Sequence, residues 1–293
     1  MEIKPIQNYS YSSKTSFKHW DRTVYKVGTN IGRENVINRN NTYFFRDPIF
    51  WIDIVDFLEK KVKDIPRINI YSYGCSDGSD VYTLIMSLLG RKNKDLLKKC
   101  SPIIAKDLDP LAIKRAKSNA YFITKSEKED INLCTNGKFD KFFLPLEKQS
   151  EVVPEANMKL NPELTQYAQY SIANVLQDYK KINPNNSIIF LRNILPYIKE
   201  NSNETFLKDR EWKTQKKFLK DLYNHLGENS YIVIGGYDRY EMGNNLLKTL
   251  QEIGFIQTPI LNLYKKGSNA EKTFHNNFSG KIVDFFQRLY FWF

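Results

Sequence analysis

A turn rich in glycine and small polar residues lies at 74–78, directly after a short apolar run. Its sequence is GCSDG, and Gly74 and Gly78 allow a sharp turn and a close approach of the backbone to a ligand. If a helix follows, its unpaired N–H groups suit a carboxylate or a phosphate. The alternative is an ordinary strand-to-helix turn capped by Asp77 or Ser79, and this motif alone does not decide between the two.

An acidic residue ends the next apolar segment of the sequence. Asp107 closes the stretch IIAKD, and a carboxylate at the end of such a strand can accept both hydroxyls of a ribose. Asp109 follows and precedes a proline, which is typical of a helix N-cap. We therefore assign Asp109 to the cap and Asp107 to the ribose.

Two arginines stand beside aromatic or apolar runs. Arg46 follows the aromatic pair of TYFFRDP, just before a predicted helix. Arg192 follows an apolar run in FLRNILPY, together with Asn193 and Tyr197, where open α/β sheets bind ligands. A structural salt bridge is the alternative for Arg192, and spacing alone does not favour the ligand role.

The elements that must position these residues alternate between short apolar strands and helices. The predicted strands are 67–73, 103–106, 187–191, 231–235 and 255–264, and the predicted helices are 48–63, 79–89, 110–120, 212–226 and 244–253. This alternation predicts an α/β fold of the Rossmann-like type, with a mostly parallel central sheet and helices on both faces.

Three segments fall outside the alternation. Residues 1–41 are polar, and we expect an irregular N-terminal arm. Residues 131–170 contain three prolines and predict a small insertion that could hold an antiparallel hairpin. Residues 267–293 end in KIVDFFQRLYFWF; we expect this tail to pack on the domain, with a partner- or membrane-binding segment as the alternative. The domain itself is then 42–266.

Composition limits the class of protein. Hydrophobic residues make up 41% and charged residues 26% of the 293, which is typical of a globular protein. No signal peptide, membrane span or Cys/His metal motif is evident, so we expect a cytoplasmic protein without a metal. The net charge of +11 suits an acidic partner, whether protein, lipid or nucleic acid, and a merely solvated Lys-rich surface is the alternative.

Taken together, these segments resemble the CheR family of protein-carboxyl methyltransferases. TYFFRDP (42–48) is similar to T-x-F-F-R-[ED]-P, GCSDG (74–78) to G-C-S-T-G, AKDLD (105–109) to A-[ST]-D-I-D, SIANVL (171–176) to the segment that borders adenine, and LRNILPYI (191–198) to C-R-N-V-L-I-Y-F. Five short matches in the same order are more specific than any one of them.

The resemblance implies S-adenosylmethionine as the cofactor. It places the methionine portion at Thr42, Arg46, Gly74, Ser76 and Gly78, the ribose at Asp107, the adenine at Leu108, Asn174 and Val175, and the transfer site at Arg192, Asn193 and Tyr197, with Arg192 and Asn193 also counted as cofactor-binding. The implied reaction is methyl transfer to a glutamate carboxylate. Such a carboxylate is already ionised at neutral pH, so positioning by Arg46 and Tyr197 would replace a strong base.

Two departures from the family pattern leave other functions open. Ser79 stands where the family has a glutamate, although Asp77 or Asp80 could replace its charge, and GGYD (235–238) stands where the family has G-H-S-E. One alternative is a catalytically inactive binding or scaffold protein that keeps the fold. The other is a nucleic-acid methyltransferase, which only the positive net charge of the chain supports. The expected partner is an acidic protein, with a chemoreceptor-like protein as a candidate.

Overall fold

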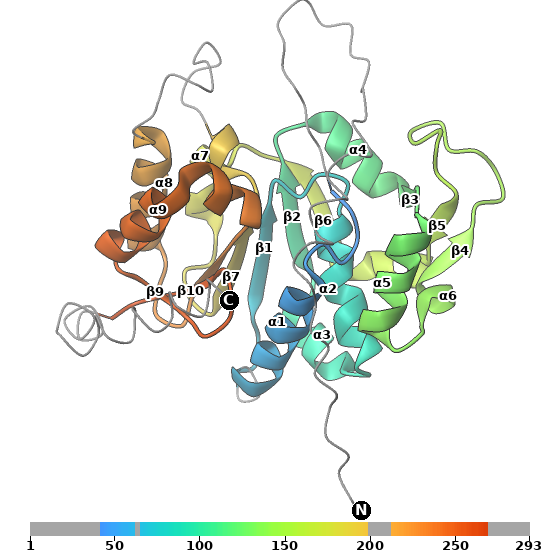
Figure 1. Cartoon of the computed structure of the whole chain (residues 1–293), viewed down its shortest axis with the longest axis horizontal. Helices are drawn as coiled ribbons and strands as arrows, with labels where there is room; N and C mark the ends of the chain where they lie inside the picture. Colours follow the sequence, from blue (N-terminus) through green and yellow to red (C-terminus); the bar gives the residue numbers. More distant parts are fainter. Residues whose placement is uncertain (1–41, 62–64, 199–211, 269–293) are drawn as a thin grey trace, which may run out of the picture. The chain divides into compact units, whose positions relative to one another are not determined.

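A seven-stranded sheet forms the centre of the described part of the molecule (Figure 1). The computed structural model describes residues 42–61, 65–198 and 212–268, and the compact unit that contains the site spans Tyr43–Phe293. The strands are β1 (Asn69–Tyr73), β2 (Ile103–Asp107), β6 (Ala168–Ile172), β7 (Ser187–Leu191), β8 (Tyr231–Ile234), β9 (Phe255–Gln257) and β10 (Leu263–Lys266). Their order is β6-β2-β1-β7-β8-β10-β9.

The strand order reverses beside β1. Strands β2 and β6 follow β1 on one side, β7 and β8 lie on the other, and all of these pairs are parallel. Strand β10 is antiparallel to both β8 and β9. Open α/β sheets bind ligands at such a reversal point, outside the carboxyl ends of the strands.

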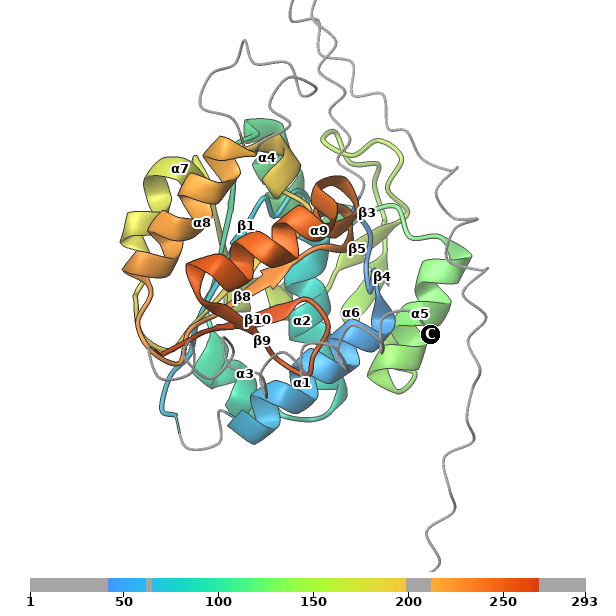
Figure 2. The ribbon, with the colours of Figure 1, turned by 60° about the vertical axis from the view of Figure 1, so that its left-hand side comes forward.

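Helices cover both faces of the sheet. They are α1 (Pro48–Lys61), α2 (Ser79–Gly90), α3 (Lys94–Cys100), α4 (Pro110–Ser118), α5 (Lys125–Thr135), α6 (Phe139–Phe142), α7 (Val175–Asp178), α8 (Lys213–His225) and α9 (Gly236–Ile253). Figures 1 and 2 show α8 and α9 on one face, with α1 and α2 on the other.

Strand β7 shows why the sheet needs both helical layers. All five of its residues are buried. Ile188 and Phe190 join the hydrophobic core with α1 and α2, while Ile189 and Leu191 join the core with α8 and α9. Because successive side chains point to opposite faces, a strand covered on both sides is apolar throughout. The predicted Rossmann-like class is confirmed.

The predicted strand 255–264 is two strands, and strand β6 was missed. Pro259 and Asn262, whose φ is 65°, lie in the turn that separates β9 from β10. Strand β6 is an edge strand with no fully buried residue, so its sequence AQYSI lacks an apolar run. Residues 168–170 of this strand fall within the predicted insertion 131–170.

The insertion folds as a small antiparallel sheet. Strands β3 (Ala120–Tyr121), β5 (Met158–Leu160) and β4 (Phe143–Pro145) lie in the order β3-β5-β4. An antiparallel pair was expected here, but the sheet also includes β3, which precedes the predicted boundary at 131. The predicted arm 1–41 and all but the first two residues of the tail lie outside the described residues.

The turn after β1 is held by its neighbours on both sides. Gly74 has a φ of 64°, and a Cβ atom there would lie 2.0 Å from Cγ2 of Ile194, in the turn after β7. Gly78 has a φ of 87°, and its Cβ would lie 2.5 Å from the hydroxyl oxygen of Tyr170 on β6. The protein's own packing therefore requires both glycines.

We expect Gly74→Ala to lower the free energy of unfolding by about 2–4 kcal/mol, because left-handed backbone strain adds to an overlap with a β-branched side chain. Gly236→Ala is the matched control, since no atom beyond its chain neighbours and the nearby backbone of its own helix lies within 4 Å of its added Cβ. That control should stay within about 1 kcal/mol of the wild type. Urea unfolding measures both, and equal effects of the two substitutions would contradict the packing argument.

Candidate functional site

The sequence-predicted residues follow the carboxyl ends of adjacent strands. The turn 74–78 follows β1, Leu108 follows β2, Asn174 follows β6, and Arg192 follows β7. These strands are parallel neighbours, so their ends open on one edge of the sheet. The fold thus gathers residues that lie far apart in the sequence.

The Asp107 carboxylate faces the turn after β1. Its Oδ2 accepts a hydrogen bond from the Ser76 N–H at 2.8 Å, and its Oδ1 accepts one from the Asp109 N–H at 2.9 Å. Burial raises the pKa of Asp107, and these N–H groups oppose the rise. Asp109 caps α4 by accepting from the Leu111 N–H at 2.8 Å, as predicted.

An exposed apolar ledge lies beside Asp107. Leu108 is 65% exposed and Ile172 is 56% exposed, and Ile172 pairs with Asp107 across β2 and β6. Asn174 caps α7, which begins at Val175, by accepting from the Leu176 N–H at 3.0 Å. Oxygen acceptors for hydroxyls beside an apolar surface for a purine fit an adenosine group. Ile172 was not predicted, because an exposed isoleucine carries no signal in the sequence.

Two arginines share one carboxylate beside the same strand ends. Nη2 of Arg46 lies 2.8 Å from Oδ2 of Asp80, and Nη1 of Arg192 lies 3.2 Å from Oδ1 of Asp80. Nη2 of Arg192 also lies 2.7 Å from Oδ2 of Asp47. The side chains are 16% (Arg46), 4% (Arg192) and 12% (Asp80) exposed, against 54% for Asp47. Asp80 is therefore the buried counter-charge of both guanidinium groups.

Arg192 is packed as well as paired. Its guanidinium carbon lies 4.9 Å from the ring centroid of Trp51 and 5.0 Å from that of Phe50, which are cation–π distances. Burial lowers the pKa of Arg192, and the negative charge of Asp80 opposes the fall. The salt bridge named as its alternative is what the structure shows, and a cofactor contact by Arg192 stays a prediction.

The carboxylates offered as substitutes for the missing family glutamate have other contacts. Asp80 pairs with the two arginines, and Oδ1 of Asp77 accepts from the N–H of Ser79 at 2.9 Å and from its hydroxyl at 2.6 Å. Burial raises the pKa of Asp77 to about 6, although the bonds from Ser79 oppose the rise. Asp77 thus supports the start of α2, as its capping alternative predicted.

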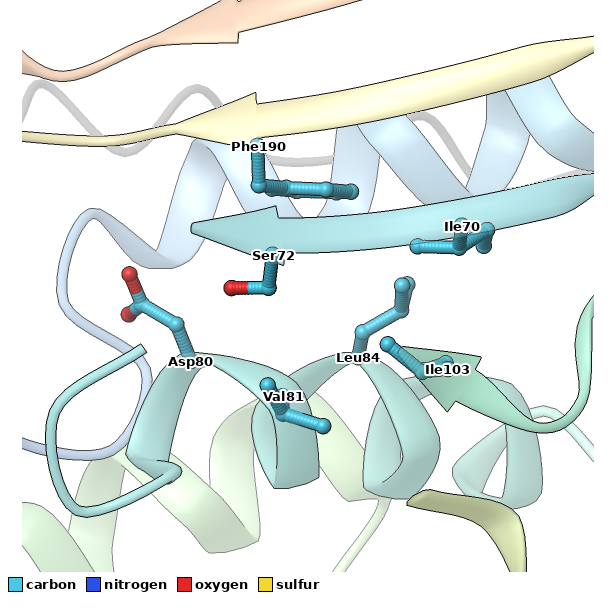
Figure 3. Close-up of a pocket in the computed structure, with 7 residues that line it drawn as sticks. All are labelled: Ile70, Ser72, Asp80, Val81, Leu84, Ile103 and Phe190. Carbon is cyan, nitrogen blue, oxygen red and sulfur yellow. The ribbon is translucent and has the colours of Figure 1, made fainter. Parts of the chain in front are cut away.

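A cavity of about 10 Å³ lies beneath α2, against β1 and β7. Its lining residues are Ile70, Ser72, Asp80, Val81, Leu84, Ile103 and Phe190. Figure 3 shows the Asp80 carboxylate and the Ser72 hydroxyl at the same end of this space. The volume suits one water molecule at most, so the cavity belongs to the core and not to a cofactor site.

The turn after β7 is fastened to the start of α9. Asp238 accepts from the N–H groups of Asn193 at 2.7 Å, Leu195 at 2.9 Å and Gly235 at 2.8 Å. In return, Oδ1 of Asn193 accepts from the Tyr237 N–H at 2.9 Å. Burial raises the pKa of Asp238 to about 7, against the effect of the three N–H groups. We call these four hydrogen bonds the β7–α9 clasp.

Sequence reasoning missed Asp238 as a site residue. Its signal was present, because an acidic residue at the third position of a helix is typical of a capping arrangement. Its bonds to the turn after β7 have no sequence signal, since they join segments about 45 residues apart. Tyr197, at the end of that turn, is 46% exposed.

Thr42 belongs to the Met1–Thr42 unit, so its assignment stays a prediction. Within the described residues, no group of three or more His, Cys, Asp or Glu side chains could hold a metal ion. In the same part of the chain, no helix has the length and apolar character to cross a membrane.

The family model described as "CheR methyltransferase, SAM binding domain" matches residues 40–254 of this chain. The chain belongs to the CheR methyltransferase family. It is therefore an S-adenosylmethionine-dependent methyltransferase, and the predicted family, cofactor and reaction class are confirmed. The Asp107 acceptor and its apolar ledge fit this cofactor.

Known proteins show different degrees of similarity to this CheR-family chain. A chemotaxis protein methyltransferase of Borreliella burgdorferi is 24% identical over 220 residues, which are 72% of this chain and 68% of that protein. The magnesium protoporphyrin IX methyltransferase of Synechocystis PCC 6803 with bound SAM is 12% identical, with a TM-score of 0.35 over 85% of this chain and 88% of that one. The N-methyltransferase NodS of Bradyrhizobium japonicum WM9 is 12% identical, with a TM-score of 0.37 over 77% of this chain and 100% of that one.

We expect Asp80→Asn to lower the free energy of unfolding by about 3–5 kcal/mol, because it leaves two buried guanidinium groups without their shared counter-charge. Asp47→Asn is the matched control, since that carboxylate is 54% exposed and its loss should cost about 1 kcal/mol or less. Chemical denaturation measures both. A loss for Asp80→Asn no larger than that of the control would contradict the assigned role of Asp80.

Proposed function

We propose that this methyltransferase acts on the side-chain carboxylate of a glutamate in an acidic partner protein. The supporting observation is the arginine pair, which places two buried positive charges at the strand ends beside the turn that meets Asp107. Asp80 and Asp47 balance the two charges, so a carboxylate acceptor would be held there by directed N–H donors. The similarity to a chemotaxis protein methyltransferase makes a chemoreceptor-type protein our candidate acceptor.

The cofactor residues are proposed on the geometry of the strand ends. Asp107 would accept hydrogen bonds from the ribose, and Leu108, Asn174, Val175 and Ile172 would border the adenine. The turn with Gly74, Ser76 and Gly78, together with Arg46, would surround the methionine portion. The assignment of Thr42 to the same portion rests on the family resemblance alone. When bound, S-adenosylmethionine supplies an electrophilic methyl group on a positively charged sulfur.

The protein's own part in the reaction is to orient the acceptor. One oxygen of an ionised carboxylate would take the methyl group while the methyl–sulfur bond breaks and a neutral thioether leaves, so no residue has to remove a proton first. Arg46 would donate a charged hydrogen bond to the acceptor, and Tyr197 would orient it from the other side. Asp80 fixes the direction of the Arg46 guanidinium, with Nη2 2.8 Å from Oδ2. Most of the rate gain would then come from alignment.

Arg192 and Asn193 would border the transfer site without leading the chemistry. Arg192 lies between aromatic rings and two carboxylates that balance its charge, so it has little charge left to act on the acceptor. The carbonyl of Asn193 belongs to the β7–α9 clasp. Both residues would therefore shape the site mainly by holding the chain that carries Tyr197.

Asp107→Asn should weaken the binding of S-adenosylmethionine roughly ten- to a hundredfold, because an ionised acceptor for the ribose hydroxyls is lost. Asp109→Asn is the matched control, since asparagine caps a helix as well as aspartate does. Isothermal titration calorimetry measures both. Equal affinities of the two variants would contradict the ribose assignment.

Incubation with methyl-labelled S-adenosylmethionine and bacterial lysate should label protein in a form that mild base releases as methanol. Carboxyl esters hydrolyse in this way, whereas methylated amines do not. Arg46→Ala should lower the labelling rate roughly a hundredfold, as loss of a directed donor does in other sites. Arg46→Lys, which keeps the charge but not the planar fork, should recover part of it.

A base-stable label would contradict the carboxylate acceptor. Full turnover by Arg46→Ala would remove Arg46 from the mechanism. Tight cofactor binding without labelling of any protein would favour an inactive binding protein.

A further inference from the structure

Two tyrosine rings are stacked beside the proposed transfer site. The ring centroids of Tyr197 and Tyr237 lie 6.1 Å apart, and the ring planes differ by 25°. Tyr197 ends a short 3-10 turn after β7, and Tyr237 is the second residue of α9. The stack therefore joins side chains from the two segments that the β7–α9 clasp already joins through the backbone.

The exposure of Tyr197 shows what the stack contributes. Tyr197 is 46% exposed, so much of its surface meets solvent instead of the core. An aromatic side chain has several allowed orientations, whereas a hydroxyl that orients an acceptor must keep one. An offset-stacked neighbour restricts the ring by packing along its face.

Tyr237 is suited to this support because its backbone is held in place. Its N–H donates to Oδ1 of Asn193 at 2.9 Å, and the adjacent Asp238 carboxylate binds the N–H groups of Asn193 and Leu195. Burial, the neighbouring Tyr197 and hydrogen bonds with Glu241 and Tyr197 raise the pKa of Tyr237, and the same hydrogen bonds hold its hydroxyl.

We infer that Tyr237 is a positioning residue for methyl transfer, which acts by holding the ring of Tyr197 in its working orientation. The inference rests on the proposed function, because it takes Tyr197 as the residue that orients the acceptor. Tyr237 lies in GGYD, where this chain departs from the G-H-S-E pattern, so the supporting ring is this chain's own feature.

The first test compares three variants of α9 in the full-length enzyme. Tyr237→Leu should lower kcat roughly three- to tenfold, the effect expected from one lost ring stack. The KM for S-adenosylmethionine and its calorimetric affinity should stay within about twofold of the wild type. Tyr237→Phe keeps the ring but loses the hydrogen bond with Tyr197, and it should restore part of kcat. Tyr240→Leu, the same change at a side chain that is 76% exposed on the same helix, should leave kcat unchanged.

The second test asks whether Tyr237 acts through Tyr197. In a Tyr197→Phe background, Tyr237→Leu should cause almost no further loss of kcat, because the hydroxyl that it positions is gone. Losses that multiply in the double variant would overturn the inference, since they indicate two independent effects. If Tyr237→Leu leaves kcat unchanged, the inference is overturned as well. The same holds if Tyr237→Phe recovers none of the kcat that Tyr237→Leu loses.

The tests separate the inference from the proposed function. If Tyr197→Phe is impaired while Tyr237→Leu is not, only the positioning role of Tyr237 fails. If Tyr197→Phe has full activity, the proposed role of Tyr197 fails and the positioning role fails with it. If the wild type binds the cofactor but methylates nothing, the proposed function fails before either variant is compared.

Discussion

The site depends on one shared carboxylate. Asp80 lies in the first turn of α2 and balances Arg46 from the segment before α1 and Arg192 from the end of β7. A buried guanidinium is costly to remove from water unless it is paired with good geometry. By pairing with both of them, Asp80 ties the first turn of α2 to the segment before α1 and to the end of β7. The turn 74–78, which leads into α2, and the arginine pair therefore depend on the same ionic contact.

Left-handed backbone conformations occur around this contact, as they do elsewhere in the described residues. Phe45, Asp47, Ser76 and Asn193 are not glycines, yet their φ angles are 53°, 64°, 50° and 59°. For Phe45 and Ser76 this conformation costs on the order of 1–2 kcal/mol and persists only where the surroundings over-determine it, whereas aspartate and asparagine adopt it more readily. The surroundings here include the Phe45 N–H, which donates to Oγ1 of Thr83 at 3.0 Å. The fold therefore stores strain in the segments that carry the proposed site.

The sequence predicts those elements of the fold best whose side chains are buried on both faces. Strand β7 was placed at its observed bounds because both of its faces are covered, which leaves a continuous apolar run. Strand β6 was missed because an edge strand needs no such run. The sequence placed Asp107 at the end of a strand, because the apolar run before it is a local signal. In the structure Asp107 is the last residue of β2. The contacts of Asp80 and Asp238 depend on residues distant in the chain, which spacing does not reveal.

The β7–α9 clasp has a consequence for the exchange of parts between related enzymes. Asp238 and Asn193 each bind backbone groups of the other's segment, so neither segment has its bonding partners in a foreign context. Gly235 adds a steric condition, because a Cβ there would lie 1.9 Å from Oδ1 of Asn193. In a chimera, 191–198 and 235–238 form one module that has to be transplanted as a pair.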